Sequence, residues 1–306
     1  MPQWDFLNFF ADQAKRFLTF KLHLNTEATD LICEGDQIKG VQAQTTNGAV
    51  EFFAHLVVGA DGRHSRIREA AGLKPIDLGA PMDVLWMRLP KSNKDPAQTL
   101  GYLDNGKILI MLDRGDYWQC AHIVEKGSFD QIQRAGWPAF RANLAAIAPF
   151  ISDRVDHLTD WKDVKLLTVA VNRLPTWYRA GLLCVGDSAH AMSPIGGVGI
   201  NLAIQDAVAA ANRLATPLKN RAVTVYDLAA VQKRRELPAR VTQDIQVFIQ
   251  NRVLVPALQN KLPKDRLPFP IRLLKRFPML QRIPARLVGI GIRPEHVAPP
   301  LAHQVR

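Results

Sequence analysis

The stretch GLLCVGDSAHAMSPIGGVGIN, residues 181–201, decides the fold of this 306-residue chain. Its apolar run is typical of a buried strand that leads into Asp187, and glycines then open an Ala-rich helix near Gly199. In sheets whose strands alternate with helices, ligands bind beyond the carboxyl ends of the strands. The stretch therefore predicts an α/β fold with a ligand site beside Asp187.

The chemistry of this stretch suits a cofactor that carries hydroxyl groups and negative charge. An ionised Asp187 accepts two hydrogen bonds at once, which fits sugar or ribityl hydroxyls. Pro194, Gly196, Gly197 and Gly199 leave the backbone bare where the helix begins. A helix N-terminus stabilises an anion laid against it, and a reduced flavin develops such charge on its pyrimidine edge. The alternative is a glycine-rich turn that holds no ligand.

A second stretch, LVVGADGRHSRIREAAGL, repeats the arrangement at residues 56–73. An apolar strand runs into Asp61 and Gly62, and glycine lets the chain turn sharply while its N–H groups stay free. The helix that follows carries Arg63, Arg66 and Arg68 near its start. These cations stand where they can meet phosphates or carboxylates. The alternative is a strand-turn-helix joint in which Asp61 only caps the helix.

The rest of the chain divides into strand-rich and helical stretches. Apolar residues one helical turn apart predict an amphipathic helix at the N-terminus, and turn dipeptides predict an antiparallel meander that ends in a strand at 56–60. The other expected elements are strands within 82–125, a helix over 129–151, strands near 165–171 and 181–187, and helices from Gly199, over 223–236 and over 239–258. An antiparallel sheet inserted between the two motifs predicts an α/β protein with a second layer.

Composition excludes several other classes of protein. Hydrophobic residues make up 47% and charged residues 22%, which is typical of a globular chain. The sequence has no apolar run of about 18 residues, as a membrane span needs, and no signal-peptide pattern. Cys33, Cys120 and Cys184 stand far apart, so we expect a reduced, cytoplasmic protein without disulfides. The eight histidines are scattered, and we expect no metal site.

The positive charge is local to the C-terminal segment. Residues 261–293 hold nine Lys or Arg and one acid, which accounts for +8 of the net charge of +11. The segment mixes apolar residues with arginine and is interrupted by prolines, so it suits peripheral contact with an anionic membrane. A solvated basic pair of helices that caps the domain is the alternative. Because the rest of the chain is nearly neutral, we expect no nucleic-acid partner.

Together, VVGADGRHSRIR and VGDSAHAMSPIGGVGIN resemble the DG and GD fingerprints of the para-hydroxybenzoate hydroxylase-type (group A) FAD-dependent monooxygenases. The opening PQWDFLNFFADQA and the closing PARLVGIGIRPEHV are also similar to segments of that family. The resemblance implies an FAD/NAD(P)-binding Rossmann-like domain, incomplete at its N-terminus, with an inserted antiparallel-sheet substrate domain. The implied parts are 1–80 and 166–258 for FAD, 81–165 for a substrate-binding sheet and helix, and 259–306 for the basic C-terminal segment.

The resemblance also implies roles for individual residues. Asp187 would bind the ribityl chain, residues 196–201 would line the pyrimidine edge of the ring, and Asp61 would serve FAD and the pyridine nucleotide. The full implied cofactor-binding set is Gln3, Asp61, Gly62, Arg63, Gly186, Asp187, Pro194, Gly196, Gly197, Val198, Gly199, Ile200 and Asn201. No catalytic residue is implied, because this reaction class needs no acid or base at a fixed motif position. His190 is interpreted as structural.

The implied activity is oxygen insertion. NADPH or NADH would reduce FAD, and molecular oxygen would then form a flavin hydroperoxide that hydroxylates or epoxidises an aromatic or apolar substrate. The Met, Trp, Leu and Tyr residues within 82–123 suit such a substrate, although core packing explains them equally well. The alternatives are a flavin-dependent dehydrogenase or reductase of a lipid or isoprenoid, and a non-catalytic, membrane-peripheral binding module.

One family feature is missing, because the sequence contains no GxGxxG, the turn that holds the ADP pyrophosphate. Without the strand that precedes this turn, Val57, Val58, Leu182 and Leu183 are expected to be poorly covered. Three explanations are open: a true start upstream of Met1, a partner chain that supplies the GxGxxG unit, or an inactive remnant.

Overall fold

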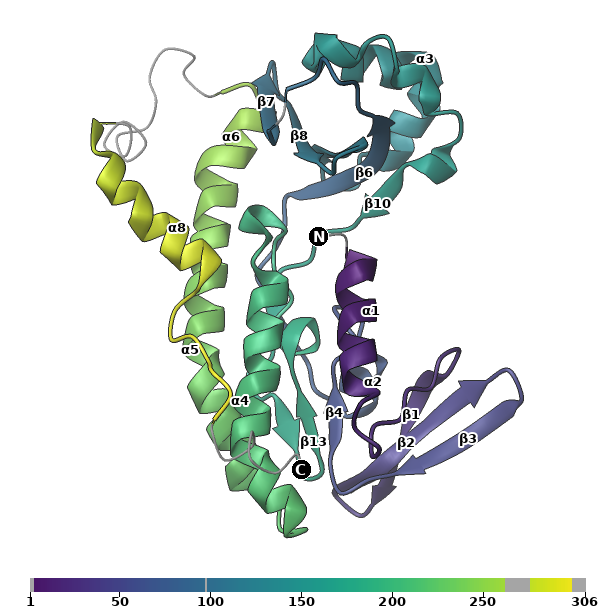
Figure 1. Cartoon of the computed structure of the whole chain (residues 1–306), viewed down its shortest axis with the longest axis vertical. Helices are drawn as coiled ribbons and strands as arrows, with labels where there is room; N and C mark the ends of the chain where they lie inside the picture. The colour runs from purple at the N-terminus through teal and green to yellow at the C-terminus, as the bar shows by residue number, and fades with distance from the viewer. Residues whose placement is uncertain (1–2, 97, 262–275, 299–306) are drawn as a thin grey trace. The chain divides into compact units, whose positions relative to one another are not determined.

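The computed structural model describes residues 3–96, 98–261 and 276–298 (Figure 1). The chain forms two compact units, which are described separately. Unit 1 comprises Met1–Leu24, Ala80–Val169 and Ile249–Leu262, and unit 2 comprises Asn25–Gly79, Ala170–Phe248 and Pro263–Arg306. Both units are therefore assembled from segments that lie far apart in the sequence.

Unit 2 is built around a parallel pair of strands that carries both sequence motifs. Strand β4 (Val57–Gly59) pairs in parallel with β13 (Leu182–Cys184), and β12 (Tyr178–Arg179) adds an antiparallel strand on the far side of β13. The α/β class predicted from the two motifs is confirmed. In this sheet β4 is an edge strand.

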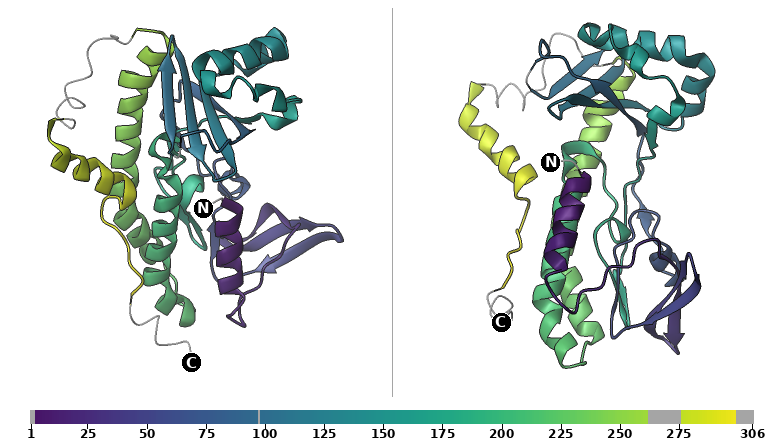
Figure 2. Two further views of the ribbon diagram at one scale, coloured as in Figure 1. Left: turned by 45° about the horizontal axis from the view of Figure 1, so that its top comes forward. Right: turned by 45° about the vertical axis from the view of Figure 1, so that its right-hand side comes forward.

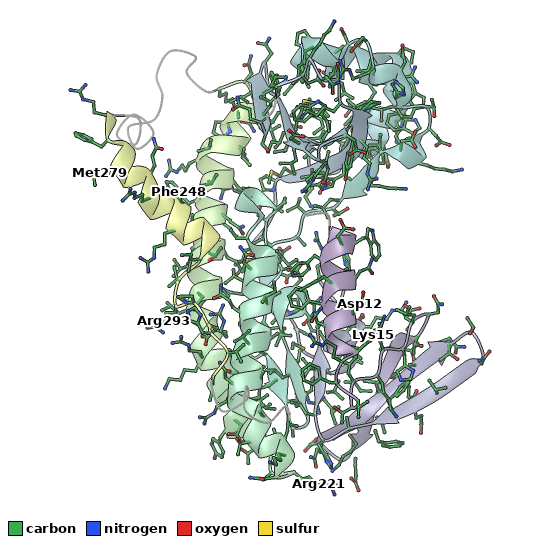
Figure 3. The ribbon with its side chains drawn as sticks, viewed as in Figure 1. Asp12, Lys15, Arg221, Phe248, Met279 and Arg293 are labelled. Atoms are coloured by element: carbon green, nitrogen blue, oxygen red, sulfur yellow. The ribbon has the colours of Figure 1, made fainter. Side chains whose placement is uncertain are left out.

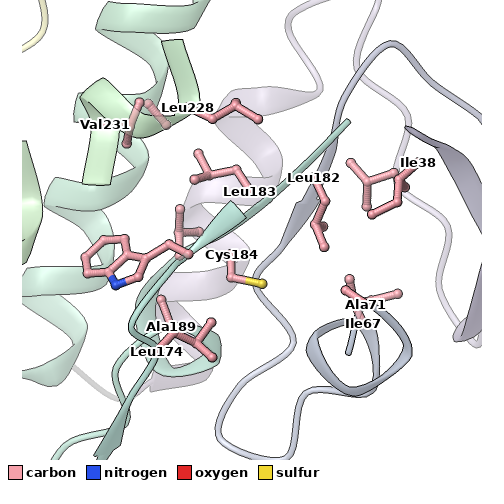
Figure 4. Packing of buried hydrophobic residues seen from close by; sticks show 14 of the residues in the cluster. Ile38, Ile67, Ala71, Leu174, Leu182, Leu183, Cys184, Ala189, Leu228 and Val231 are labelled. Atoms are coloured by element: carbon pink, nitrogen blue, oxygen red, sulfur yellow. The ribbon is translucent and has the colours of Figure 1, made fainter. Parts of the chain in front are cut away.

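Two long helices, α4 (Gly199–Lys219) and α5 (Val225–Ile249), lie side by side in every view of unit 2 (Figures 1 and 2). Their apolar faces pack with β13 and with the short helix α2 (Arg66–Ala70) in one core, where Leu182, Leu183, Leu228 and Val231 are buried (Figure 4). The prediction that four residues of the parallel strands are poorly covered was wrong for three of them. Val57, Leu182 and Leu183 are at most 9% exposed because these elements cover them, whereas Val58 on the edge strand is 50% exposed.

An antiparallel meander joins this core through a close backbone crossing. Its strands are β1 (Glu27–Glu34), β2 (Gln37–Thr45) and β3 (Gly48–Phe53), as the turn dipeptides predicted. Ile38 donates its backbone N–H to the Ala180 carbonyl at 2.8 Å. A Cβ at Gly181 would lie 1.9 Å from the Ile38 carbonyl oxygen, so only glycine allows this approach. A short pair, β5 (Ile76–Asp77) with β11 (Asn172–Arg173), completes the strands of unit 2.

The prediction of two helices over 223–236 and 239–258 was wrong, because α5 continues through Pro238. Proline cannot donate the usual backbone hydrogen bond, which weakens a helix interior. Here Pro238 and Ala239 are buried, and this packing offsets the loss. After Ile249 the chain forms a π-helical turn, Gln250–Leu254, and then α6 (Val255–Leu258). The C-terminal part of unit 2 has a 3-10 turn, Pro278–Gln281, and α8 (Arg282–Gly289).

Unit 1 is a five-stranded antiparallel sheet with a helix on one face. The strand order is β10-β6-β9-β8-β7, with β6 (Met82–Pro90), β7 (Leu100–Asp104), β8 (Lys107–Asp113), β9 (Tyr117–Glu125) and β10 (Lys165–Leu167). Alternate residues of β6, β8 and β9 pack against α3 (Phe129–Ile147), which has a break in its helical backbone at Gly136. Three 3-10 turns, Pro149–Ile151, Val155–His157 and Trp161–Asp163, follow α3. The N-terminal helix α1 (Gln3–Ala14) is also assigned to this unit.

None of the described helices is both long and apolar enough to cross a membrane. The three cysteines, Cys33, Cys120 and Cys184, are free.

Two buried carboxylates anchor the sheet of unit 1. Asp83 accepts hydrogen bonds from Gly127 N, Val169 N and Lys126 Nζ. Asp95 accepts from Ser92 N, from Trp118 Nε1 at 2.8 Å and from Arg154 at 2.7 Å. Burial by itself would raise the pKa of both carboxyl groups, but these donors together lower it below 3.8.

We expect the free energy of unfolding to fall as the pH drops below 3.8. Because Asp83 and Asp95 have lower pKa values when folded than when unfolded, the unfolded chain binds protons first. Their stabilisation is complete above the unfolded pKa and is lost as the pH falls through the folded pKa. Urea unfolding at pH ~6 and pH ~3 measures the difference.

The Asp95→Asn variant tests the cause. It should lower the free energy of unfolding by about 3 kcal/mol, because the Arg154 guanidinium, 11% exposed, would lose its buried partner. Asp153→Asn is the matched control, since that carboxylate meets the same guanidinium but is 69% exposed, and its loss should be much smaller. Equal losses in the two variants would contradict this account.

Candidate functional site

The two motifs meet at one edge of the parallel sheet. Because β4 and β13 run in the same direction, the loops after Gly59 and after Cys184 leave the sheet together. Val185 N donates to Gly59 O at 2.9 Å, and Ser188 Oγ donates to the same carbonyl at 2.6 Å. The structure therefore brings Asp61 and Asp187, which stand 126 positions apart in the sequence, to neighbouring loops.

Arginines of the first motif join it to the second. Arg68 is buried and donates to Ser188 O at 3.1 Å and to Arg63 O at 2.9 Å. Arg63 lies 3.7 Å from the Asp187 carboxylate, and both side chains are partly exposed. Sequence reasoning grouped Arg68 with the cations that could meet a ligand, but its guanidinium holds two protein carbonyls. Arg68 is the third residue of α2 and follows the core residue Ile67, and neither position in the sequence distinguishes this role from contact with a ligand.

Asp61 acts on the helix that follows it. One carboxylate oxygen accepts from Ser65 Oγ, and the other accepts from Ile67 N at 3.1 Å. Ser65 Oγ in turn accepts from Arg68 N and caps α2. These contacts agree with the alternative in which Asp61 caps the helix that follows it. A contact of Asp61 with FAD stays a prediction.

The glycine-rich turn presents bare backbone at the start of α4. Gly196 and Gly197 have φ angles of +77° and +63°, and nothing lies within 4 Å of a Cβ built on Gly197. Helix α4 has no side-chain N-cap, so its first N–H groups are not covered by a side chain. The Asp187 carboxylate lies 3.9 Å from a Cβ built on Gly199. A carboxylate that can accept hydrogen bonds from hydroxyl groups thus lies beside a helix N-terminus whose backbone N–H groups can donate to an anion. This combination fits the ribityl chain and the flavin ring of FAD.

Gly186 must be glycine for a steric reason. Its φ angle is +60°, and a Cβ would lie 2.9 Å from Ala203 Cβ on α4. The next two residues differ in burial, since the Asp187 side chain is 32% exposed whereas Ser188 is buried.

Other predicted site residues have simpler positions. Pro194 precedes the 3-10 turn Ile195–Gly197, Val198 is buried, and Ile200 and Asn201 lie in the first turn of α4. Gly62 has a φ angle of +85° in the turn before α2. Gln3 opens α1 in unit 1, and its side chain lies outside the described part of the chain.

Burial raises the pKa of the Cys184 thiol, next to this site, to about 11. The thiol is therefore neutral at physiological pH and does not supply a thiolate nucleophile. A hollow of about 420 Å³ on unit 2 involves none of the motif residues. It lies between the 175–178 segment and α5 and is lined by Pro175, Thr176, Tyr178, Ala229, Gln232, Lys233, Glu236, Leu237 and Arg240. We place the site at the motifs because their polar groups converge there.

Gly186→Ala should destabilise the chain by about 2 kcal/mol, because it adds a steric clash with Ala203 to the cost of a left-handed backbone. Gly197→Ala is the control, since it has a similar φ angle but open space, and should cost about 1 kcal/mol. Chemical denaturation of both variants gives the comparison. A Gly186→Ala loss no larger than that of the control would show that the contact with α4 does not constrain the loop.

Comparison with known proteins agrees with this geometry. The family model described as FAD binding domain matches residues 1–244. The chain is 33% identical over 258 residues to the 6-methylpretetramide 4-monooxygenase of Streptomyces rimosus, an alignment that covers 83% of the chain and 61% of that protein. It is 28% identical over 283 residues to the FAD-dependent monooxygenase idtM of Claviceps paspali, covering 81% of the chain and 54% of the relative. The chain thus spans about half to three fifths of the length of these relatives.

Solved structures show the same fold. The anhydrotetracycline hydroxylase OxyS of Streptomyces rimosus superposes with a TM-score of 0.71 at 18% identity, over 96% of this chain and 58% of that one. The family match covers most of the chain, including both motifs, and confirms the resemblance drawn from them. The chain belongs to the FAD binding domain family.

Proposed function

We propose that this chain is part of an FAD-dependent monooxygenase that acts on an aromatic or apolar substrate and is reduced by NADPH or NADH. The observation that carries the proposal is the partly exposed Asp187 carboxylate beside the bare turn and uncapped N-terminus of α4. The monooxygenase names of the relatives support the same activity. When bound, FAD would supply the redox chemistry that activates oxygen.

The residues of unit 2 have distinct tasks in this proposal. Asp187 accepts hydrogen bonds from the ribityl hydroxyls, and the backbone of Gly196, Gly197 and Gly199 approaches the flavin ring closely. The N-terminus of α4 stabilises negative charge on the ring's pyrimidine edge. Arg63, 3.7 Å from Asp187, balances the carboxylate and adds a cation near the cofactor. Asp61, Gly62 and the other predicted residues complete the contacts with FAD and the nucleotide.

The sheet of unit 1 is proposed to cover the substrate. Its strand register places Trp86, Ala121 and Ile110 side by side across β6, β9 and β8, on the face opposite α3. Trp86 and Ile110 are only half buried. An apolar row of this kind suits an aromatic ring better than a charged molecule. We accordingly assign residues 81–165 to substrate binding, 1–80 and 166–258 to FAD, and 259–306 to the basic C-terminal segment.

We propose that the turn that binds the ADP pyrophosphate, here called the cradle, belongs to a GxGxxG unit outside this sequence. The unit would lie either on a longer polypeptide that includes this chain or on a partner chain. The sequence has no GxGxxG, and β4 offers an unpaired strand edge among the described strands, with Val58 half exposed. A parallel strand placed on this edge would complete the sheet beside both motifs.

The first test is the visible spectrum of the purified chain after FAD is added and the protein is desalted. We expect a retained flavin band, and expect Asp187→Ala to reduce it strongly because the ribityl hydroxyls lose their acceptor. Asp244→Ala is the control, since this carboxylate is 64% exposed and pairs with Arg173. A chain that never retains FAD alone but does so with a GxGxxG partner would support the separate cradle. A chain that never retains FAD under either condition would overturn the proposed cofactor.

Oxygen consumption separates the monooxygenase from a dehydrogenase. With NADPH and candidate phenols, a monooxygenase consumes oxygen in step with product, whereas a dehydrogenase does not. The second outcome would overturn the proposed reaction while leaving FAD binding intact.

We also propose peripheral membrane contact through residues 261–293, on the strength of their net charge of +8. Of the cations in this segment, Arg272 and Lys275 lie outside the described residues, whereas Arg276, Arg282 and Arg286 are exposed. Reversing the charge of Arg272, Lys275 and Arg276 should reduce sedimentation with phosphatidylserine vesicles several-fold. Reversing Lys15, Lys162 and Arg66, all outside the segment, is the control. Unchanged binding in the first variant would remove the proposal.

A further inference from the structure

A buried carboxylate lies directly behind the loop that carries Asp187. Asp206 sits on α4, one turn after Leu202 and on the same side as Ala209 and Ala210, and its side chain is fully buried. An acid on the core face of a helix is costly unless it is hydrogen-bonded and paired with a cation. Asp206 has both kinds of partner, and they come from two different segments of unit 2, the loop 186–190 and α5.

Two of these partners belong to the cofactor loop. Gly186 N donates to Asp206 Oδ2 at 3.1 Å, and His190 Nε2 lies 2.6 Å from the same oxygen. His190 packs on Trp177 with ring centroids 4.8 Å apart, and its Nδ1 has no hydrogen-bond partner within the described residues. One carboxylate oxygen therefore holds both ends of the five-residue loop that contains Asp187.

The other carboxylate oxygen is held from α5. Arg235 Nε donates to Asp206 Oδ1 at 3.0 Å, and the Arg235 side chain is fully buried. Arg235 also donates to Arg293 O at 3.1 Å and lies 3.6 Å from the Glu295 carboxylate (Figure 3 labels Arg293). The arginine is thus fixed on two sides and fixes Asp206 in turn.

The partners of Asp206 favour its ionised form. Burial alone would raise the pKa of the Asp206 carboxyl, but His190 and Arg235, through charge and hydrogen bonds, lower it. Asp206 is therefore ionised near neutral pH, and an ionised carboxylate only accepts hydrogen bonds. Each of its donors must then point inward, which fixes the orientation of the Gly186 peptide.

We propose that Asp206 is a positioning residue for the cofactor: it fixes the main chain of Gly186 and His190 so that Asp187 faces the FAD site. The alternative is a buried ion pair that stabilises the fold without bearing on the loop. Asp187 lies immediately after the anchored Gly186, so a shift of that peptide moves its carboxylate directly. This inference rests on the proposed FAD site, which the experiment tests separately.

The experiment compares Asp206→Asn with Asn212→Ala. Both residues lie on α4, but Asn212 donates to His296 O and accepts from Ala298 N, both of which lie far from the loop in the sequence. Titration of each variant of the 306-residue chain with FAD, followed by flavin absorbance and fluorescence, gives affinity and ring environment. Hydrogen–deuterium exchange of the peptide that spans Gly186–Ser188 reports the loop without any cofactor.

We expect Asp206→Asn to weaken FAD binding roughly ten-fold or more, to shift the bound-flavin spectrum and to speed exchange at the loop, because the amide cannot satisfy all three donors. Asn212→Ala should lower the unfolding midpoint without these changes. Unchanged affinity and exchange in Asp206→Asn, or equal changes in both variants, would overturn the positioning role.

Two further outcomes are separable. If the wild-type chain does not bind FAD, either alone or with a GxGxxG partner, the cofactor proposal fails by itself. Faster loop exchange in Asp206→Asn then still supports positioning, whereas unchanged exchange overturns it. If Asp206→Asn does not fold, His190→Gln and His190→Leu replace it. Gln keeps an N–H donor for Asp206 and should preserve loop protection, whereas Leu should lose it. Equal protection in these two variants would overturn the role.

Discussion

The structure of unit 2 depends on the parallel pairing of β4 with β13. The pairing ends at Gly59, whose carbonyl accepts hydrogen bonds from Val185 N and Ser188 Oγ. Parallel strands end at the same sheet edge, so this contact brings both motif loops to one place. Arg68, buried between the loops, then holds Ser188 O. Without the register of this pair, Asp187 and the first motif would have no reason to act together.

The need to pair buried charges is the second constraint. In each unit, hydrogen-bond donors from separate chain segments meet at one buried carboxylate. Asp206 in unit 2 and Asp83 in unit 1 each accept hydrogen bonds from separate chain segments. Removing one donor leaves the others facing an incomplete partner, so such groups specify one arrangement of the segments more than they add stability. At Asp206 this arrangement includes the loop that carries Asp187, which links the packing of α4 and α5 to the proposed cofactor chemistry.

Much of the fold could be predicted from local pattern. The meander before β4, the strands within 82–125 and the helix that opens near Gly199 follow from hydrophobic period and turn residues, which act within a few positions. The helix break expected near Pro238 was wrong because tertiary burial offset a local penalty. The exposure expected for Leu182 and Leu183 was wrong for the same kind of reason, since α4, α5 and α2 cover them.

The sequence by itself determined the two loop-forming motifs, their order and the acid that each carries, because glycine spacing and strand pattern are local properties. Only the tertiary structure decided what those acids and cations do. Asp61 turned toward its own helix, Arg68 toward Ser188 O, and Asp206 toward Gly186 N, across separations of 6, 120 and 20 positions. The longer contacts depend on which strands pair and which helix faces are buried, and a side chain's partner is chosen by that packing and not by its neighbours in the sequence.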